Sequence, residues 1–261
     1  MNVPTPLSAV ETAPENSGAS EKTCRTGKLA LVIPTLCEAD NIQVLLERIQ
    51  KSLEPLNIPY ELIVVDDDSR DGIEGLVQAV ACKDERIRLL VRTGVRGLAG
   101  AVIHGWAKTD ADILGVIDAD LQHPPELLPQ LWRALEGNDV VLASRYAPQG
   151  SRNNWNRFRH LISQIAIWMT LPLQRPTIRV MDPMSGFFLV RRDAIRDLAL
   201  HPTGFKILLE ILVRGDIRSA KEIPFSFGHR YKGRSKAGLK VGLEYLLLLA
   251  KLRKKRLRAA P

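Results

Sequence analysis

The sequence predicts an α/β protein with a mainly parallel central sheet and helices on both faces. Between residues 28 and 144, short apolar runs alternate with segments of helical spacing. Such alternation is typical of βαβ units, whose strands lie parallel. The runs are rich in Val, Ile and Leu without alternating polar residues, as expected for strands covered on both faces. A chain of 261 residues, 45% hydrophobic, is long enough to bury a full core.

Each expected strand except the last is followed by an expected helix. The strands are residues 29–33, 62–65, 87–91, 113–117 and 140–143, and the helices are residues 42–53, 75–81, 98–107 and 126–135. Because parallel strands end at the same edge of a sheet, the loops that follow them meet there. In open α/β sheets, that edge is where ligands bind.

The two ends of the chain differ from this pattern. Residues 1–27 contain several prolines and no continuous apolar block, so we expect a disordered lead-in rather than a secretory signal. The three cysteines are scattered and lack metal-ligand spacing, which favours a reducing compartment and a cytoplasmic location.

A second apolar run follows the expected sheet. It begins at residue 161 and extends for about 13 residues, which is short of the roughly 20 needed to cross a bilayer. Arg157 and Arg159 precede this run and Trp168 lies within it. This pattern predicts a helix over residues 158–173 that lies in a membrane interface. A buried helix of the second half is the alternative.

The basic character of the chain belongs to its C-terminal end. Residues 228–261 carry eleven Lys or Arg against Glu244, a net charge of +10, which leaves the remainder at −2. An apolar run within residues 239–252 precedes the final basic cluster, which predicts an amphipathic helix on an anionic membrane surface. A solvated basic end is the alternative. A nucleic-acid-binding protein would need interleaved aromatic residues, and Tyr231 and Tyr245 are followed by leucines, so we expect no nucleic-acid partner.

Two carboxylates and an amide alternate directly after the strand at residues 113–117. Asp118, Asp120 and Gln122 provide hard oxygen ligands, which suit Mg²⁺ or Mn²⁺ with substrate phosphates completing the shell. Two aspartates in a loop can also simply cap a helix. Their position after a buried strand and before Pro124-Pro125-Glu126 favours a metal site.

Other polar residues follow the first two strands. Asp66 and Asp67 come after the strand at residues 62–65, and Asp71 is expected to cap the next helix. Adjacent acids repel one another, so a cation or a hydrogen-bond donor must lie beside Asp66 and Asp67, the ligand candidates. The first strand leads into Pro34 and Glu38. Three strands therefore deliver polar groups to one edge.

Several motifs occur in one order along residues 28–242. They are Leu31-Val32-Ile33-Pro34-Thr35 with Glu38, Val64-Val65-Asp66-Asp67 with Ser69 and Asp71-Gly72, Gly97-Leu98-Ala99 before His104-Gly105, the segment 118–125, Ser144-Arg145-Tyr146, the segment 182–188, Gly204-Phe205-Lys206 with Glu210, and the segment 230–236. In this combination the chain resembles the polyprenyl-phosphate (dolichol-phosphate) mannosyltransferases of family 2, which are inverting glycosyltransferases with the Rossmann-like GT-A fold.

The resemblance implies one catalytic domain, residues 28–238, followed by the helix at 239–261. It implies Asp120 and Arg145 as catalytic residues. It assigns the metal to Asp118, Asp120 and Gln122, the nucleotide sugar to Pro34, Glu38, Asp66, Asp67, Asp118, Ala119, Asp120, Arg145, Arg230 and Lys236, and the acceptor phosphate to Arg159, Ser163, Arg230 and Lys236. Leu36, Cys37 and Asp68 depart from the family's usual residues, which weakens the assignment of the base contacts.

The expected reaction is metal-dependent transfer of mannose from GDP-mannose to a polyprenyl phosphate at the cytoplasmic face of a membrane. A phosphate acceptor is already ionised near neutral pH, so it needs no general base. Asp182 and Glu210 would serve as bases if the acceptor were a hydroxyl group. Alternatives are glucose transfer from UDP-glucose and a non-catalytic nucleotide-sugar sensor. Attachment would use the two short apolar helices or a membrane partner subunit.

Overall fold

The computed structural model describes residues 27–147, 164–201 and 206–226, together with residues 247, 249, 250, 252 and 253 near the C-terminus. The predicted lead-in falls outside the described residues except for Gly27, as do most of the predicted C-terminal helix and the first part of the predicted helix at 158–173.

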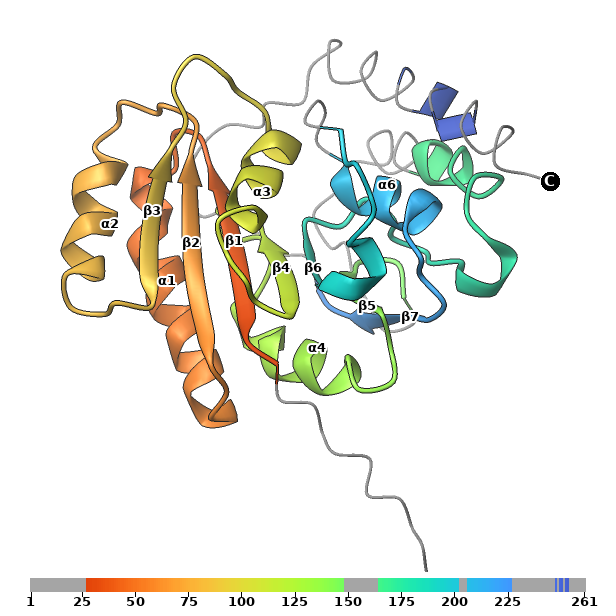
Figure 1. Cartoon of the computed structure of the whole chain (residues 1–261), viewed down its shortest axis with the longest axis horizontal. Coiled ribbons are helices and arrows are strands. Elements are labelled where there is room, and N and C mark those ends of the chain that lie inside the picture. Colours follow the sequence, from red (N-terminus) through yellow and green to blue (C-terminus); the bar gives the residue numbers. More distant parts are fainter. Residues whose placement is uncertain are drawn as a thin grey trace, which may run out of the picture.

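A seven-stranded sheet forms the centre of the protein, with strand order β3-β2-β1-β4-β6-β5-β7 (Figure 1). The strands are β1 (Leu29–Thr35), β2 (Tyr60–Asp66), β3 (Ile87–Val91), β4 (Ile113–Ile117), β5 (Val140–Ser144), β6 (Phe187–Arg191) and β7 (Ala220–Pro224). Four of the six neighbouring pairs are parallel, and both antiparallel pairs involve β6. The predicted mainly parallel sheet is confirmed.

Helices pack on both faces of this sheet. They are α1 (Ala39–Leu53), α2 (Ile73–Ala81), α3 (Leu98–Trp106), α4 (Leu128–Ala134) and α6 (Ile207–Arg214), with short 3-10 turns η1 (Glu54–Leu56), η2 (Pro125–Leu127), η3 (Pro176–Ile178) and η4 (Arg192–Ile195). Buried residues of α1, α2 and α4 join one core cluster, and those of α3 join a second cluster. Helix α6 contributes to the second cluster and, through Leu209 and Val213, to a smaller third one. Successive residues of β1 alternate between the first two clusters, because a strand projects side chains to opposite faces.

Strand β6 brings residues 182–186 to the edge of the sheet where the parallel strands end. It lies between β4 and β5 and runs antiparallel to both. Ile117 at the end of β4 pairs with Phe187 at the start of β6, so the loop before Phe187 lies beside the loop after Ile117. Neither β6 nor β7 is among the strands predicted from the sequence. This antiparallel strand therefore adds residues 182–186 to an edge otherwise built from the earlier strands.

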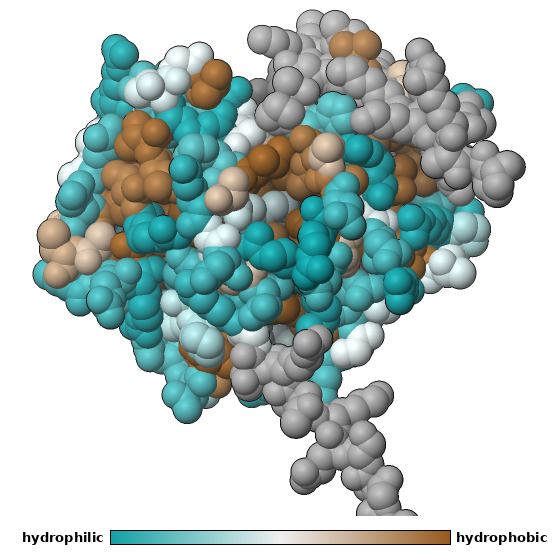
Figure 2. Space-filling model, viewed as in Figure 1, coloured by the Kyte–Doolittle hydropathy of each residue, from teal (hydrophilic) through white to brown (hydrophobic). Residues whose placement is uncertain are grey.

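The surface is hydrophilic over much of the face in Figure 2, and hydrophobic residues reach it over β3 and between α3 and α6. Residues 164–168 form a helical turn within the predicted 158–173 helix. Ile167 is buried, whereas Ile165, Trp168 and Met169 are 53%, 77% and 40% exposed. None of the helices in the described part of the chain has the length and apolar character to cross a bilayer.

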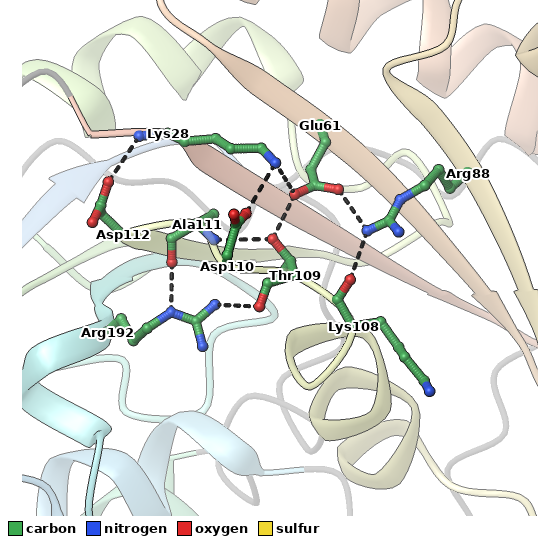
Figure 3. A network of polar contacts seen from close by, with 9 residues as sticks. All are labelled: Lys28, Glu61, Arg88, Lys108, Thr109, Asp110, Ala111, Asp112 and Arg192. Carbon is green, nitrogen blue, oxygen red and sulfur yellow. Dashed lines mark hydrogen bonds and ion pairs between the residues drawn. The ribbon is translucent and has the colours of Figure 1, made fainter.

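A polar network fastens the opposite edge of the sheet, where the parallel strands begin (Figure 3). The carboxylate of Glu61 on β2 is its centre and is almost fully buried. It accepts hydrogen bonds from Lys28 Nζ at 2.8 Å, Arg88 Nη2 at 2.6 Å and Thr109 Oγ1 at 2.5 Å. Arg192 donates to the carbonyl groups of Thr109 and Ala111. The network joins the first three strands to the loop before β4.

Replacing Glu61 with glutamine is expected to destabilise the protein by about 2 kcal/mol at pH 7, because Lys28 and Arg88 lose a charged acceptor. Burial works to raise the pKa of Glu61, but the hydrogen bonds from Lys28 and Thr109 and the charge of Arg88 outweigh it and lower the pKa. Its stabilisation is therefore present above about pH 4.3, the unfolded value, and is lost as the pH falls through the folded pKa.

Urea denaturation of both proteins at pH 7 and at acid pH measures this difference. Asp110→Asn is the matched control, because Asp110 also pairs with Lys28 but its side chain is 90% exposed, and it should leave the unfolding free energy nearly unchanged. If the unfolding free energies of wild type and Glu61→Gln differed by the same amount at both pH values, the stabilising role given to the ionised Glu61 would be contradicted.

Candidate active site

The loop after β4 separates metal-ligand candidates from core residues by simple alternation. Asp118, Asp120 and Gln122 are partly exposed, whereas the intervening residues Ala119 and Leu121 are buried in the core. The loop thus directs three oxygen-bearing side chains away from the core side. Because the Ala119 side chain is buried, a contact between Ala119 and a nucleotide sugar would come from its backbone. All three predicted metal ligands are consequently placed at the carboxyl edge of the sheet.

Two interactions shape this loop. The carboxylate of Asp120 accepts the backbone N–H of Gln122 at 3.1 Å, a local turn that aspartate commonly forms. Leu121 has a φ of 59°, in the left-handed region that non-glycine residues seldom adopt. Burial of the Leu121 side chain in the core offsets the cost of this backbone conformation. The Asp120 turn and the buried Leu121 side chain therefore fix the conformation of this loop.

Arg145 at the end of β5 is held by Asp182. Its Nε and Nη2 atoms each lie 2.7 Å from a different oxygen of the Asp182 carboxylate, and its backbone N–H donates to the same group at 3.1 Å. Asp182 is fully buried and the Arg145 side chain is 13% exposed. Although burial works to lower the pKa of Arg145, the bond to Asp182 raises it. Arg145 is thus a fixed and largely buried cation.

The carboxylates considered as general bases are both engaged by the protein. Asp182 binds Arg145 as described, and its own backbone N–H donates to Glu222. Glu210 on α6 is buried, accepts the backbone N–H of His201 at 3.1 Å and contacts the His201 ring and Arg214. A base must reach the proton it removes. The positions of these two carboxylates therefore favour an acceptor that arrives already ionised.

Two further residues lie within electrostatic reach of this cluster. Burial and, after it, the charge of Arg145 lower the pKa of Lys206 to about 8, while Asp118 and Asp182 act in the opposite direction. Burial also lowers the pKa of His123 to about 3, with a smaller contribution from Arg145, so its ring is neutral. Neither residue has a role predicted from the sequence. Lys206 appears only within a motif before an apolar helix, and His123 directly follows the metal-ligand pattern.

The loops after β1 and β2 are joined to each other. Asp66 is fully buried and accepts hydrogen bonds from Thr35 Oγ1 and the Ser69 backbone, each at 2.8 Å, and from Ser69 Oγ. The Ser69 hydroxyl in turn accepts the N–H of Cys37 at 2.8 Å. Asp66 therefore builds the turn that connects these loops, and its contact with a nucleotide stays a prediction.

Asp67 and Asp71 also serve the loop structure. Asp67 accepts the Gly97 N–H at 2.7 Å and lies 3.4 Å from Arg92, which provides the donor and the cation expected beside the acidic cluster. Burial raises the pKa of Asp67 against the effect of these two partners. Asp71 accepts the N–H groups that begin α1 and α2, at Ala39 and Ile73. The N-cap residue of α2 is Gly72 and not the predicted Asp71. The Asp71 side chain nevertheless accepts the first N–H group of each of the two helices.

The remaining nucleotide candidates lie at the same edge. Pro34 is the penultimate residue of β1 and is partly exposed. Glu38 directly precedes α1, and its carboxylate accepts the side-chain amide of Asn41 at 2.7 Å. Arg159, Ser163, Arg230 and Lys236 lie outside the described residues. The structure thus brings together the predicted metal ligands, Arg145 and the two nucleotide loops, all at the carboxyl edge of the sheet.

The donor set at this edge fits a divalent cation that shares its shell with a substrate. Within the described ranges, no three His, Cys, Asp or Glu side chains cluster so as to hold a metal by themselves. Asp118, Asp120 and Gln122 offer two carboxylates and one amide, and Mg²⁺ or Mn²⁺ typically completes such a set with phosphate oxygens and water. Metal binding at this loop is therefore expected to depend on a phosphate-bearing ligand.

Sequence comparisons give one family and several relatives. Residues 30–199 match the family described as Glycosyl transferase family 2. A protein named dolichol-phosphate mannosyltransferase from Pyrococcus furiosus is 42% identical over 87% of this chain and 64% of its own length. Proteins of the same name from Mycosarcoma maydis and Saccharomyces cerevisiae are 37% and 39% identical, over 95% and 85% of this chain and 86% of each relative. The chain thus spans less than two thirds of the Pyrococcus relative.

Solved structures share the fold at lower identity. Mannosyl-3-phosphoglycerate synthase from Rubrobacter xylanophilus has a TM-score of 0.63 at 20% identity and covers 89% of this chain and 74% of its own. Glucosyl-3-phosphoglycerate synthase from Mycobacterium tuberculosis, in complex with Mn²⁺, UDP-glucose and phosphoglyceric acid, gives 0.61 at 23%, over 88% and 80%. The mannosyltransferase PcManGT from Pyrobaculum calidifontis, in complex with GDP-Man and Mn²⁺, gives 0.59 at 18%, over 90% and 65%.

Proposed function

This chain belongs to glycosyl transferase family 2, and from that premise we propose that it transfers mannose from GDP-mannose to the phosphate of a polyprenol. The predicted resemblance to the polyprenyl-phosphate mannosyltransferases and the predicted GT-A fold are both confirmed. The observation that carries the proposed reaction is the charge arrangement at the sheet edge. Asp118, in the partly exposed loop after β4, lies within electrostatic reach of Arg145. The buried carboxylate of Asp182 holds Arg145 in one orientation.

This arrangement suits a diphosphate leaving group. Asp118, Asp120 and Gln122 would hold Mg²⁺ or Mn²⁺, which supplies positive charge to the diphosphate when bound. Arg145 is kept in one orientation by Asp182 and contributes a second positive charge without reorganisation. In the proposed reaction, an acceptor phosphate oxygen forms a bond to the anomeric carbon as the bond from that carbon to the diphosphate breaks, with inversion at that carbon.

The engaged carboxylates support the choice of a phosphate acceptor. Asp182 and Glu210 are buried and bound to Arg145 and to His201 with Arg214, so neither is positioned to take a proton from a hydroxyl group. A phosphate monoester has a second pKa of about 6 and arrives as an oxyanion. Glycosyl transfer to such an acceptor needs no proton removal, which matches the groups present.

The choice of GDP-mannose follows the relatives rather than the site. Three relatives carry the name dolichol-phosphate mannosyltransferase, and PcManGT was solved with GDP-Man. UDP-glucose is the rival donor, because glucosyl-3-phosphoglycerate synthase shares the fold and was solved with it. The donor is tested by incubating the protein with Mn²⁺, a short polyprenyl phosphate and labelled GDP-mannose or UDP-glucose. Lipid-linked mannose is the expected product. Exclusive formation of lipid-linked glucose would show that UDP-glucose and not GDP-mannose is the donor.

We also propose that the enzyme binds to a membrane surface. Ile165, Trp168 and Met169 are spaced at positions i, i+3 and i+4 of a helical turn, so they share one exposed apolar face. Leu249 and Leu252 pack with Leu209 and Val213 of α6, and Ala166 of the same turn packs against this cluster. An exposed apolar face suits a bilayer interface, and the basic cluster that follows Leu252 in the sequence suits an anionic one. Cys37 and Cys82 form no disulfide, which fits a cytoplasmic location.

Trp168→Ser is expected to weaken binding to anionic vesicles about tenfold, because the indole is 77% exposed in water and would be buried in the interface. Co-sedimentation with vesicles that contain phosphatidylserine measures the partition. Val44→Ser on α1 is the control, since Val44 is an exposed apolar residue (40%) on a helix that packs against the other core cluster. Equal binding by wild type and Trp168→Ser would contradict this surface.

A further inference from the structure

Asp118, the first predicted metal ligand, lies in a space that only a glycine leaves open. A Cβ atom added to Gly186 would overlap the carboxylate of Asp118, with even the more distant oxygen only 2.7 Å away. The backbone of Gly186 is not in the left-handed region, so the need for glycine at this position comes from the carboxylate and not from backbone conformation.

The same residue also fixes the backbone of Asp118. The Asp118 N–H donates to the Gly186 carbonyl at 3.1 Å, which continues the antiparallel ladder of β4 and β6 by one hydrogen bond. Main chain and side chain of the ligand are therefore both in contact with one glycine. Strands β4 and β6 lie in the interior of the sheet, and all their residues except Arg191 are buried. This contact therefore cannot shift without disturbing the sheet.

His123 lies beside the same carboxylate. Its Nε2 atom is 3.7 Å from Asp118 Oδ2, and the residue is 3% exposed. The ring packs edge-on against Phe187, with 5.9 Å between centroids, and at a tilt of 38° against Phe225, with 5.1 Å between centroids. Phe187 directly follows Gly186, so His123 and Gly186 belong to one packed unit around the ligand.

We propose that Gly186 and His123 are positioning residues that hold the Asp118 carboxylate in the orientation in which it binds a divalent cation. Gly186 provides the space and the backbone acceptor, and His123 places its Nε2 atom beside the carboxylate. Buried groups around a ligand commonly orient it, and their loss typically weakens metal binding by 10- to 100-fold. The proposal rests on the metal dependence in the proposed function, but it concerns binding rather than turnover.

The first test measures Mn²⁺ affinity by electron paramagnetic resonance titration in the presence of GDP. Gly186→Ala is expected to bind Mn²⁺ at least tenfold more weakly than wild type. Gly115→Ala is the matched control, because its Cβ would meet only the ends of Leu189 and Leu31, at 2.8 Å, in the same part of the sheet. That variant should bind Mn²⁺ within twofold of wild type. Wild-type affinity in folded Gly186→Ala would overturn the proposal.

A thermal-unfolding cycle in EDTA shows whether Gly186 acts through Asp118. Gly186→Ala should lower the Tm in the wild-type background, and by less than half as much in an Asp118→Ala background, because the overlapping carboxylate is gone. Equal Tm shifts in the two backgrounds would overturn the proposal. The second background also provides a folded form of the Gly186→Ala variant for comparison if the single variant does not fold.

His123 is tested by two substitutions with opposite expectations. His123→Phe keeps an aromatic ring between Phe187 and Phe225 but removes Nε2, and should weaken Mn²⁺ binding about tenfold. His123→Gln restores an amide nitrogen near that position and should bind within threefold of wild type. Wild-type affinity in His123→Phe would overturn the role of this residue.

The outcomes also separate this proposal from the proposed function. If the wild-type protein binds no Mn²⁺ with or without GDP, both the metal dependence and this inference fail. If the variants behave as expected but no sugar reaches any polyprenyl phosphate, the proposed function fails and the positioning of Asp118 stands.

Discussion

Replacing Asp120 with asparagine should reduce mannose transfer about a thousandfold, equivalent to about 4 kcal/mol of transition-state stabilisation. Asparagine retains a side-chain oxygen that can accept the Gln122 N–H, so the turn after β4 should persist. What the substitution removes is a negative charge that would hold the cation at the diphosphate. The loss is therefore expected in turnover and in Mn²⁺ affinity, with little change in stability.

Initial rates with labelled GDP-mannose and a short polyprenyl phosphate measure this loss. Asp110→Asn is the control, because Asp110 is an exposed aspartate at the opposite edge of the sheet and should leave the rate unchanged. Thermal unfolding of each variant without metal checks that the fold is intact. A fully active Asp120→Asn protein would show that this carboxylate is not a metal ligand.

Asp182→Asn is expected to lower the unfolding free energy by about 3 kcal/mol and to reduce the transfer rate as well. Asp182 is fully buried and binds Arg145 through both carboxylate oxygens, so the substitution leaves a largely buried guanidinium without its counter-charge. Breaking a buried pair in this way typically costs 3–5 kcal/mol. Activity should fall because Arg145 is no longer held in one orientation at the site.

Urea denaturation and initial rates measure the two effects of Asp182→Asn. Asp216→Asn provides the comparison, because Asp216 pairs with Arg218 but both side chains are largely exposed. Exposed pairs contribute between about 0 and 1 kcal/mol, so this variant should stay close to wild type in both measurements. Equal stability of the Asp182 and Asp216 variants would contradict the role given to the buried pair.

The strands of the first half could be predicted from the sequence because they are continuous apolar runs. Strand β7 could not, since Ala220–Pro224 contains a lysine, a glutamate and a proline and forms an edge of the sheet, where only one side needs burial. Helix α1 begins three residues before the predicted start. Its first N–H is capped by Asp71, which is 32 residues distant along the chain, and no local pattern contains that information.

The candidate site also contains some features that could be predicted from the sequence and others that could not. The alternation of Asp118, Asp120 and Gln122 after an apolar run predicts a partly exposed ligand set, and the structure places them so. The pairing of Arg145 with Asp182 joins residues 37 apart in the chain. It depends on β6 running antiparallel beside β4 and β5, which the sequence analysis did not predict. Contacts that depend on strand order therefore required the structure.

The most direct test of the proposed function compares two acceptors that differ only in a phosphate group. Purified protein is incubated with Mn²⁺, labelled GDP-mannose and either a polyprenyl phosphate or the corresponding polyprenol. Because Asp182 and Glu210 are engaged by protein partners, we predict lipid-linked mannose from the phosphate and none from the alcohol. Equal transfer to the alcohol, or no transfer to the phosphate from any donor, would contradict the account.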